Sequence, residues 1–156
     1  MMRVAVRLLL ALALAVACIA PRADTLELPD WFGESFLEFP QDVKEAAGDG
    51  RRLMVYFWQD GCPSCRRMKE TTFADPATVA ATRAKFVPVA INVFGERELV
   101  WTDGRRMREK ELARSLGIRG TPTLLFLDEK GAEVARRVGY QPPDRFASLL
   151  AQAQGR

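Results

Sequence analysis

The feature that most constrains the fold is a pair of cysteines, Cys62 and Cys65, placed where an expected strand gives way to an expected helix. Residues 53–58 form a continuous apolar, β-prone stretch of the kind that fills the centre of a sheet. Residues 66–70 are good helix formers. The first sulfur therefore lies at the positive end of a helix dipole, which favours its thiolate form. The second lies one turn away and can close a disulfide on the first. This spacing predicts a redox-active disulfide in which Cys62 attacks and Cys65 resolves.

Other roles for the cysteine pair have less support. The chain has three cysteines and no histidine. A c-type haem site requires a histidine directly after the second cysteine, where this chain has Arg66. A closed structural zinc site requires four Cys or His ligands, and the pair supplies only two, so zinc would need two chains. A purely structural disulfide would close a very short loop and stabilise little. We therefore predict no metal and no organic cofactor.

The N-terminus has the layout of an export signal. Residues 1–23 begin with a short basic stretch, continue with an apolar run too short to span a membrane, and end in small residues. We predict a secretory signal peptide over this range. Residues 15–18 also fit the pattern at which bacterial lipoproteins are cleaved and acylated, so a lipid anchor at Cys18 is an alternative. An uncleaved N-terminal anchor is a third possibility.

The excess positive charge of the chain belongs to this N-terminal segment. The formal net charge is +3, and residues 1–23 contain three arginines and no acidic residue, so their removal leaves a neutral chain. Net charge therefore gives no support for binding to nucleic acid or another polyanion. The basic run 105–108 is followed by Glu109 and Glu111, which predicts a solvated face of mixed charge.

The remaining length suits one domain with a proper core and is too short for two. We assign residues 24–40 to a lead-in segment that lays aromatic side chains on the domain surface, and residues 41–154 to the domain. Asp103-Gly104 forms either a tight hairpin turn or part of a surface loop. Hydrophobic periodicity and capping signals predict helices at 41–47, 63–71, 76–85, 108–116 and 144–154, and strands at 52–58, 86–93, 123–127 and 133–138. Asp75 is the expected N-cap of the helix at 76–85.

This order of elements, with a cysteine pair after the first main strand, resembles the thioredoxin superfamily over residues 40–152. Three motifs carry the resemblance: Phe57-Trp58 before the cysteines, Gly-Thr-Pro-Thr at 120–123 before an apolar strand, and Asp-Glu-Lys-Gly at 128–131 in a turn. The resemblance implies an α/β fold, a three-layer sandwich in which helices flank a mixed central sheet.

The resemblance also assigns a role to Thr121 and Pro122. In that superfamily the matching proline follows a cis peptide bond and lies beside the cysteine pair. The backbone of the preceding residue can then pair with a substrate polypeptide as an added strand. Thr121 and Pro122 are therefore the expected substrate-binding residues.

Further stretches are similar to exported thioredoxins of the SoxW type, which are associated with bacterial sulfur oxidation. These are residues 59–61, 72–76, the insert with Asp103-Gly104, and 139–143. Residues 72–76 also resemble the exported thioredoxin domain of the membrane reductase DsbD. The resemblance implies a periplasmic thiol-disulfide oxidoreductase that reduces protein disulfides. It implies a membrane thiol-electron transporter of the DsbD or CcdA type as the electron donor.

Three positions depart from cytoplasmic thioredoxins. Gly61 replaces a tryptophan, Tyr56 replaces a buried aspartate, and Ala90 replaces the lysine near that aspartate. The usual proton acceptor for Cys65 is therefore missing, which favours a specialised role. The alternative function is a non-catalytic binding module on the same fold, or a Cu(I)-binding protein, although copper chaperones of this fold usually add a histidine.

Overall fold

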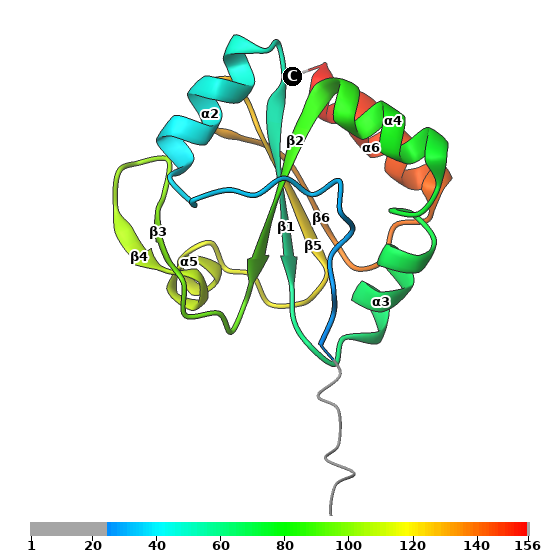
Figure 1. The fold of residues 1–156 in the computed structure, drawn as a ribbon, viewed down its shortest axis with the longest axis horizontal. Coiled ribbons are helices and arrows are strands. Elements are labelled where there is room, and N and C mark those ends of the chain that lie inside the picture. The colour runs from blue at the N-terminus through cyan, green and yellow to red at the C-terminus, as the bar shows by residue number, and fades with distance from the viewer. Residues whose placement is uncertain (1–24, 156) are drawn as a thin grey trace, which may run out of the picture.

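A computed structural model of the chain describes residues 25–155, whose centre is a four-stranded sheet with the order β2-β1-β5-β6 (Figure 1). β3 and β4 form a separate antiparallel pair. The elements are α2 (Phe39–Gly48), β1 (Arg52–Trp58), α3 (Pro63–Glu70), α4 (Pro76–Lys85), β2 (Phe86–Asn92), β3 (Glu98–Val100), β4 (Arg106–Arg108), α5 (Glu109–Ser115), β5 (Thr123–Leu127), β6 (Glu133–Val138) and α6 (Pro143–Gln154).

The sheet is mixed, as expected. β1 pairs in parallel with β2 and antiparallel with β5, and β5 pairs antiparallel with β6. The two central strands are the most apolar, and every residue of β5 is buried. Pro88 is accommodated in β2 because this strand lies at the edge of the sheet, where a missing backbone N–H costs no ladder hydrogen bond.

Helices cover both faces of the sheet, which confirms the expected α/β sandwich. In Figure 1, α2 and α5 lie on one side of the sheet, and α3, α4 and α6 lie on the other. Alternate residues of β1 belong to two separate cores: Val55 and Phe57 pack on the side of α2 and α5, and Met54 packs on the side of α3 and α6. The period of two along a strand produces this division.

Asp103-Gly104 lies in a hairpin, the first of the two alternatives. Leu99 of β3 pairs with Met107 of β4, and the Trp101 N–H donates to the Arg105 carbonyl over 2.9 Å. The connection is therefore longer than a two-residue turn. The expected cap of α4 is also present, since the Asp75 carboxylate accepts a hydrogen bond from the Thr78 N–H over 2.7 Å.

The lead-in segment contributes to both cores, so the expectation that its aromatic side chains lie on the surface was wrong for Phe32 and Phe39. Phe39, which already belongs to α2, packs against Trp101 with 4.6 Å between ring centroids. The Phe32 ring lies 5.1 Å from that of Phe73 on the other side. Phe36 is exposed. The segment crosses the sheet beside β2, and its side chains therefore reach both faces (Figure 1).

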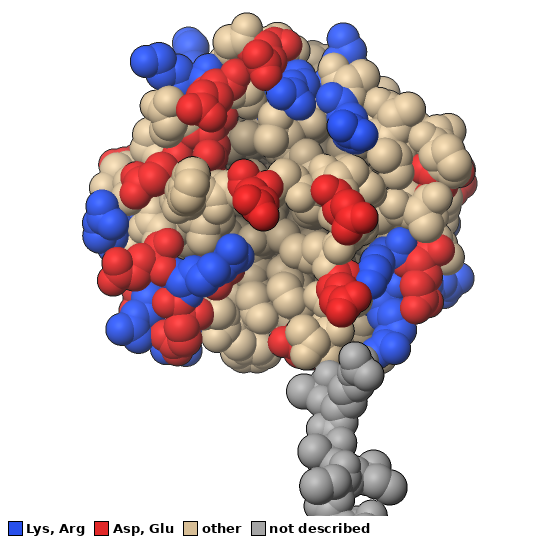
Figure 2. Space-filling model, in the orientation of Figure 1, with Lys and Arg blue, Asp and Glu red and all other residues tan. Residues whose placement is uncertain are grey.

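The surface carries mixed charge. Figure 2 shows acidic and basic side chains interspersed around the rim of the face viewed in Figure 1, with acidic side chains also near its centre. Within residues 25–155 no helix is long and apolar enough to cross a bilayer. The predicted signal at residues 1–23 and the candidate lipid anchor at Cys18 lie outside the described residues.

Candidate functional site

Cys62 lies at the junction between β1 and α3. It is the N-cap of α3, and Pro63 occupies the first turn, where its missing N–H is not needed. Gly61 immediately before it has φ +68°, a left-handed conformation that glycine adopts without strain. This conformation accounts for the glycine at a position where cytoplasmic thioredoxins have a tryptophan.

Cys62 and Cys65 are joined by a disulfide, with their Cα atoms 5.2 Å apart. Cys62 is half-buried, and Cys65 is fully buried inside the first turn of α3. The Cys65 N–H donates to the Cys62 sulfur over 3.1 Å. Cys62 is thus the sulfur that another molecule can reach. Its position at the helix N-terminus favours negative charge on it after reduction.

Thr121 lies directly against Cys62, and Pro122 follows it in the chain. The Thr121 hydroxyl donates to the Cys62 sulfur over 3.3 Å, and the Thr121 carbonyl oxygen lies 3.6 Å from the same sulfur. The second distance is a contact in this state, because a disulfide sulfur has no proton to donate. The Thr121-Pro122 peptide bond is cis. The four residues expected at the site from the sequence are therefore brought together from two segments of the chain.

Tyr56 stands where cytoplasmic thioredoxins have the buried aspartate that accepts a proton, and its side chain is a neutral hydroxyl without a hydrogen-bond partner within residues 25–155. Tyr56 and Ala90 are direct neighbours in the register of β1 and β2. The Tyr56 side chain is buried, and its hydroxyl has no hydrogen-bond partner among the described residues. Burial raises the pKa of Tyr56 well above its ordinary value. Tyr56 therefore cannot accept a proton from Cys65 as a carboxylate would.

A second contact, which the sequence analysis did not find, ties α3 to the loop before α6. The Arg67 guanidinium lies 4.3 Å from the centroid of the Tyr140 ring. The Tyr140 and Thr71 hydroxyls share a hydrogen bond of 3.0 Å, and this bond, with the nearby Arg67, lowers the pKa of Tyr140. The helix that follows Cys62 and contains Cys65 is thus also tied to the loop before α6.

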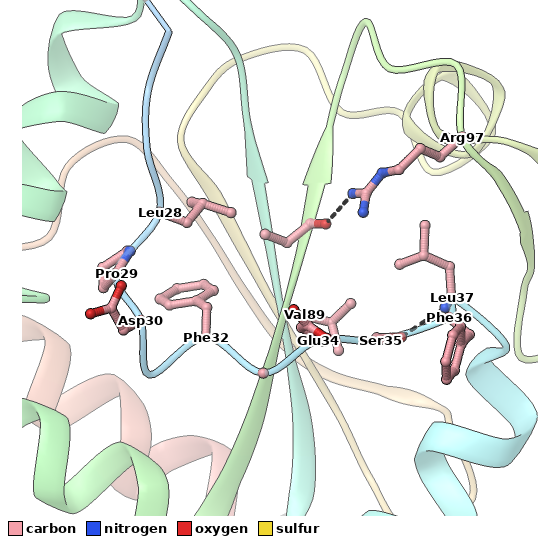
Figure 3. A pocket seen from close by; sticks show the side chains of 12 residues that line it. Leu28, Pro29, Asp30, Phe32, Glu34, Ser35, Phe36, Leu37, Val89 and Arg97 are labelled. Carbon is pink, nitrogen blue, oxygen red and sulfur yellow. Dashed lines mark hydrogen bonds between the residues drawn. The ribbon is translucent and has the colours of Figure 1, made fainter.

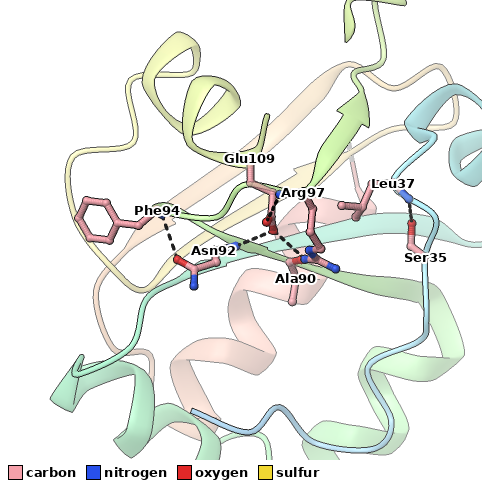
Figure 4. A network of polar contacts seen from close by, with 7 residues as sticks. All are labelled: Ser35, Leu37, Ala90, Asn92, Phe94, Arg97 and Glu109. Atoms are coloured by element: carbon pink, nitrogen blue, oxygen red, sulfur yellow. Dashed lines mark hydrogen bonds and ion pairs between the residues drawn. The ribbon is translucent and has the colours of Figure 1, made fainter. Parts of the chain in front are cut away.

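A buried carboxylate organises the loop that follows β2, as Figure 4 shows. Glu109 is 1% exposed, so the expectation that it lies on a solvated face was wrong. It accepts hydrogen bonds from the backbone N–H groups of Asn92 and Arg97 at 3.0 and 3.3 Å, and from the Arg97 guanidinium at 2.6 Å. Three donors offset the cost of burying its charge.

Among the hollows on the described surface, a large one lies away from the cysteines and a smaller one adjoins them through Thr121. We call it the Thr121 groove: it measures about 180 Å³, and its lining includes Gln59, Val93, Phe94, Arg114, Arg119 and Thr121. The larger hollow, about 780 Å³, lies between the lead-in segment and β2 (Figure 3). Neither a cysteine nor Thr121 lines it, so its size does not make it the redox site. Among residues 25–155 no cluster of three or more His, Cys, Asp or Glu side chains could hold a metal ion.

Comparison with known proteins shows which family and which relatives this chain is similar to. The family model of the thioredoxin-like domain matches residues 39–154. The thiol:disulfide interchange protein DsbD of Ralstonia nicotianae is 30% identical over 123 residues, which cover 78% of this chain and 19% of that protein. This chain therefore spans about a fifth of the length of that relative.

Solved structures show the same fold. A thioredoxin from Thermus thermophilus is 32% identical, with a TM-score of 0.59 over 75% of this chain and 84% of the other. The oxidised C-terminal domain of DsbD from Neisseria meningitidis has a TM-score of 0.54 over 73% of this chain and 88% of the other. At 21% identity, the second likeness concerns the fold alone.

Proposed function

The chain belongs to the family of thioredoxin-like domains, and on this premise we propose that it is an exported thiol-disulfide oxidoreductase that reduces protein disulfides through Cys62 and Cys65. The single observation that carries the proposal is the position of the disulfide. Its outer sulfur is half-buried at a helix N-terminus and in contact with Thr121, and its inner sulfur is fully buried. This arrangement suits an exchange reaction better than a structural cross-link, which would close only a short loop.

In the proposed reaction the reduced protein attacks first through the Cys62 thiolate. Its sulfur forms a bond to one sulfur of the substrate disulfide, and the other substrate sulfur leaves as a thiolate and takes up a proton. The Cys65 sulfur, after losing its proton, then attacks Cys62 and releases the second substrate thiol. Two electrons pass to the substrate, and the protein ends with the disulfide that the structure contains.

Substrate docking is assigned to the segment before β5. The Thr121 carbonyl lies beside the Cys62 sulfur, so an extended substrate chain that pairs with this backbone would bring its own cysteine to the attacking sulfur. The reaction needs no organic cofactor or metal. It does need a donor that returns two electrons and two protons to the disulfide after each cycle.

The donor, the pathway and the compartment are part of the proposal. Sequence similarity to DsbD proteins supports a membrane thiol-electron transporter of the DsbD or CcdA type as donor. The stretches similar to SoxW-type proteins support a role in sulfur oxidation or periplasmic thiol reduction. The predicted signal at residues 1–23 supports export to the periplasm, with a lipid anchor at Cys18 as the alternative to plain secretion.

We further propose that the protein works as a reductant. Position 64 is a serine, whereas strongly oxidising exported relatives have a histidine that stabilises the thiolate. A less stabilised thiolate disfavours the reduced form, so the potential should lie nearer to that of thioredoxin, about −270 mV, than to about −120 mV. Equilibration of the protein with glutathione buffers measures this value. A potential near the upper figure would contradict the direction and leave the exchange chemistry intact.

The deciding experiment is reduction of insulin and of a small disulfide by the purified mature protein. The wild type should turn over, Cys62→Ser should not, and Cys65→Ser should accumulate mixed disulfides that identify substrates. Alkylation of the reduced protein at mildly acidic pH should modify Cys62 at least about tenfold faster than buried Cys65. Retention of Cu(I) without thiol turnover would instead favour the non-catalytic, copper-binding alternative.

A further inference from the structure

The Thr121 groove continues directly from the attacking sulfur. Thr121 lines the groove and also contacts Cys62, so the two sites share a residue. Gln59, which follows β1 and precedes the cysteine turn, lines the same groove. A polypeptide that brings a cysteine to Cys62 along the Thr121 backbone therefore lays its neighbouring residues in or beside this groove.

One wall of the groove is an exposed aromatic side chain. Phe94 is 70% exposed, and among residues 25–155 Phe36 is the only other large hydrophobic residue exposed to at least this degree. The half-buried Val93 and Ile118 also line the groove. Exposed apolar surface next to a reactive group indicates contact with a partner, because it would otherwise remain in water at a cost.

Hydrogen bonds hold the loop that carries Phe94 in a defined conformation. The Phe94 N–H donates to the Asn92 side-chain oxygen over 3.0 Å, and the Gly95 N–H donates to the Asn92 carbonyl over 2.8 Å. The buried Glu109 holds both ends of this loop through Asn92 and Arg97. Figure 4 shows the Phe94 ring pointing away from these contacts. A preformed wall reduces the ordering cost of binding.

The remaining feature of the groove is its charge. Arg114 and Arg119 line it, and both are exposed. Within residues 25–155 neither guanidinium has a hydrogen bond or ion pair, and no acidic side chain lines the groove. Seven arginines within residues 25–155 form an ion pair with a carboxylate, as Arg105 does with Asp103 and Arg136 with Glu133. The two at the groove are left available to a ligand.

We propose, resting on the proposed function, that the Thr121 groove selects substrates in which the attacked cysteine is flanked by an apolar residue and an acidic residue. The apolar residue packs on Phe94. The carboxylate lies between Arg114 and Arg119. The occupant is a segment of the substrate polypeptide itself, and its residues flank the cysteine that forms the mixed disulfide with Cys62. The groove thereby directs the protein to a class of disulfides in acidic, partly apolar surroundings.

The test uses peptides that each contain one cysteine in a mixed disulfide with 2-mercaptoethanol, which adds no charge. In each peptide a leucine is next to the cysteine, and a Glu, Gln or Lys is two residues from the cysteine. Separate peptides place this variable residue before or after the cysteine. The measured quantity is the second-order rate constant for reduction by the reduced protein at low salt. Because an exposed ion pair contributes about 2- to 5-fold, two arginines should favour Glu over Lys by about tenfold on one side of the cysteine.

Variants of the groove residues test the proposal by their effect on the ratio of the rate constants for the Glu and Lys peptides. Arg114→Gln combined with Arg119→Gln should bring the Glu-to-Lys ratio close to one, and high salt should do the same in the wild type. Arg83→Gln, on the exposed face of α4 across the sheet, is the matched control and should keep the ratio. Phe94→Ala should slow reduction of the leucine peptides relative to peptides with serine at that place.

The outcomes separate the two proposals. If the wild type reduces bis(2-hydroxyethyl) disulfide but treats the Glu, Gln and Lys peptides alike, the selectivity is wrong and the proposed function stands. If it reduces none of these disulfides, the proposed function fails and the selectivity with it. A dimer in analytical ultracentrifugation that Phe94→Ala dissociates would also overturn the inference, because a second copy would then occupy the groove.

Discussion

The hydroxyl of Thr121 donates a hydrogen bond to the sulfur of Cys62 over 3.3 Å, although 59 residues separate them in the chain. The carbonyl of the same threonine lies 3.6 Å from that sulfur. One residue thus combines a donor for the attacking sulfur with the backbone proposed to receive substrate.

The first prediction concerns this donor. A hydrogen bond to a thiolate is stronger than one to a neutral sulfur, so the Thr121 hydroxyl should favour the reactive form of Cys62. Thr121→Val should shift the pH profile of Cys62 alkylation to higher pH and slow disulfide reduction at neutral pH by about 2- to 10-fold. Thr121→Ser keeps the hydroxyl and should retain the parental profile. Identical profiles for valine and serine variants would show that the hydroxyl has no such role.

The second prediction concerns the buried Glu109. Glu109→Gln replaces a charged acceptor of three hydrogen bonds and leaves the Arg97 guanidinium without its carboxylate. The free energy of unfolding should fall by about 2 kcal/mol, measured by urea denaturation. Glu98→Gln, on the exposed edge of β3, should change it by less than about 0.5 kcal/mol. Equal effects of the two substitutions would mean that the Glu109 contacts add nothing to stability.

Gly95 makes the same loop sensitive to a single methyl group. A Cβ at this position would lie 2.6 Å from the Glu109 Cδ and 3.0 Å from the Asn92 carbonyl oxygen. Gly95→Ala should therefore displace the carboxylate and lower the free energy of unfolding by about 1 to 3 kcal/mol. Gly48→Ala, where a Cβ would meet no atom within 4 Å, is the control and should not destabilise the protein. A stable Gly95→Ala protein would indicate that the loop rearranges freely.

Ionisation of the buried Tyr56 should lower the free energy of unfolding at high pH. Burial raises the pKa of Tyr56 above its ordinary value of 10.0, so the folded state holds this proton more tightly than the unfolded state. The contribution is complete below pH 10 and is lost above it, by about 1.4 kcal/mol per pH unit. Tyr56→Phe should remove this part of the decline and, because the buried hydroxyl is unpaired, should leave stability at neutral pH unchanged or higher.

Denaturant titrations of the wild type and of Tyr56→Phe between pH 7 and pH 11 would test this. Tyr140→Phe is the control, because the pKa of Tyr140 is lowered and its loss cannot remove the decline. Parallel curves for the wild type and Tyr56→Phe would show that the Tyr56 hydroxyl ionises as freely in the folded protein as in the unfolded chain.

Two phenylalanines of the lead-in segment give a matched pair. Phe32 packs on Tyr56 and Phe73, whereas Phe36 is 97% exposed. Phe32→Ala should lower the free energy of unfolding by about 3 kcal/mol, and Phe36→Ala by less than about 0.5 kcal/mol. Thermal and urea denaturation of both variants measure this difference. Small effects of both would mean that the lead-in segment contributes little to the core.

The features that the sequence determined by itself are those set by neighbouring residues. The bounds expected for β1, β5 and β6 agree with the structure. In β1 and β5 a run of apolar, β-branched or aromatic residues between turn signals specifies the strand locally. The cap at Asp75 and the place of Cys62 at the start of α3 are local in the same sense. The resemblance carried by short motifs supplied Thr121 and Pro122, which local patterns alone would not have joined to the cysteines.

Only the tertiary structure decided which polar and aromatic side chains are buried. Glu109 follows a basic run and reads as a surface residue, yet Asn92, 17 positions earlier, and Arg97 turn their donors toward it. Phe32 reads as part of a surface segment until that segment is placed against Phe73. Burial depends on which distant segment completes the environment of a side chain. The spacing of neighbouring residues does not identify that distant segment, so the Glu109 network and the Thr121 groove could be found only in the tertiary structure.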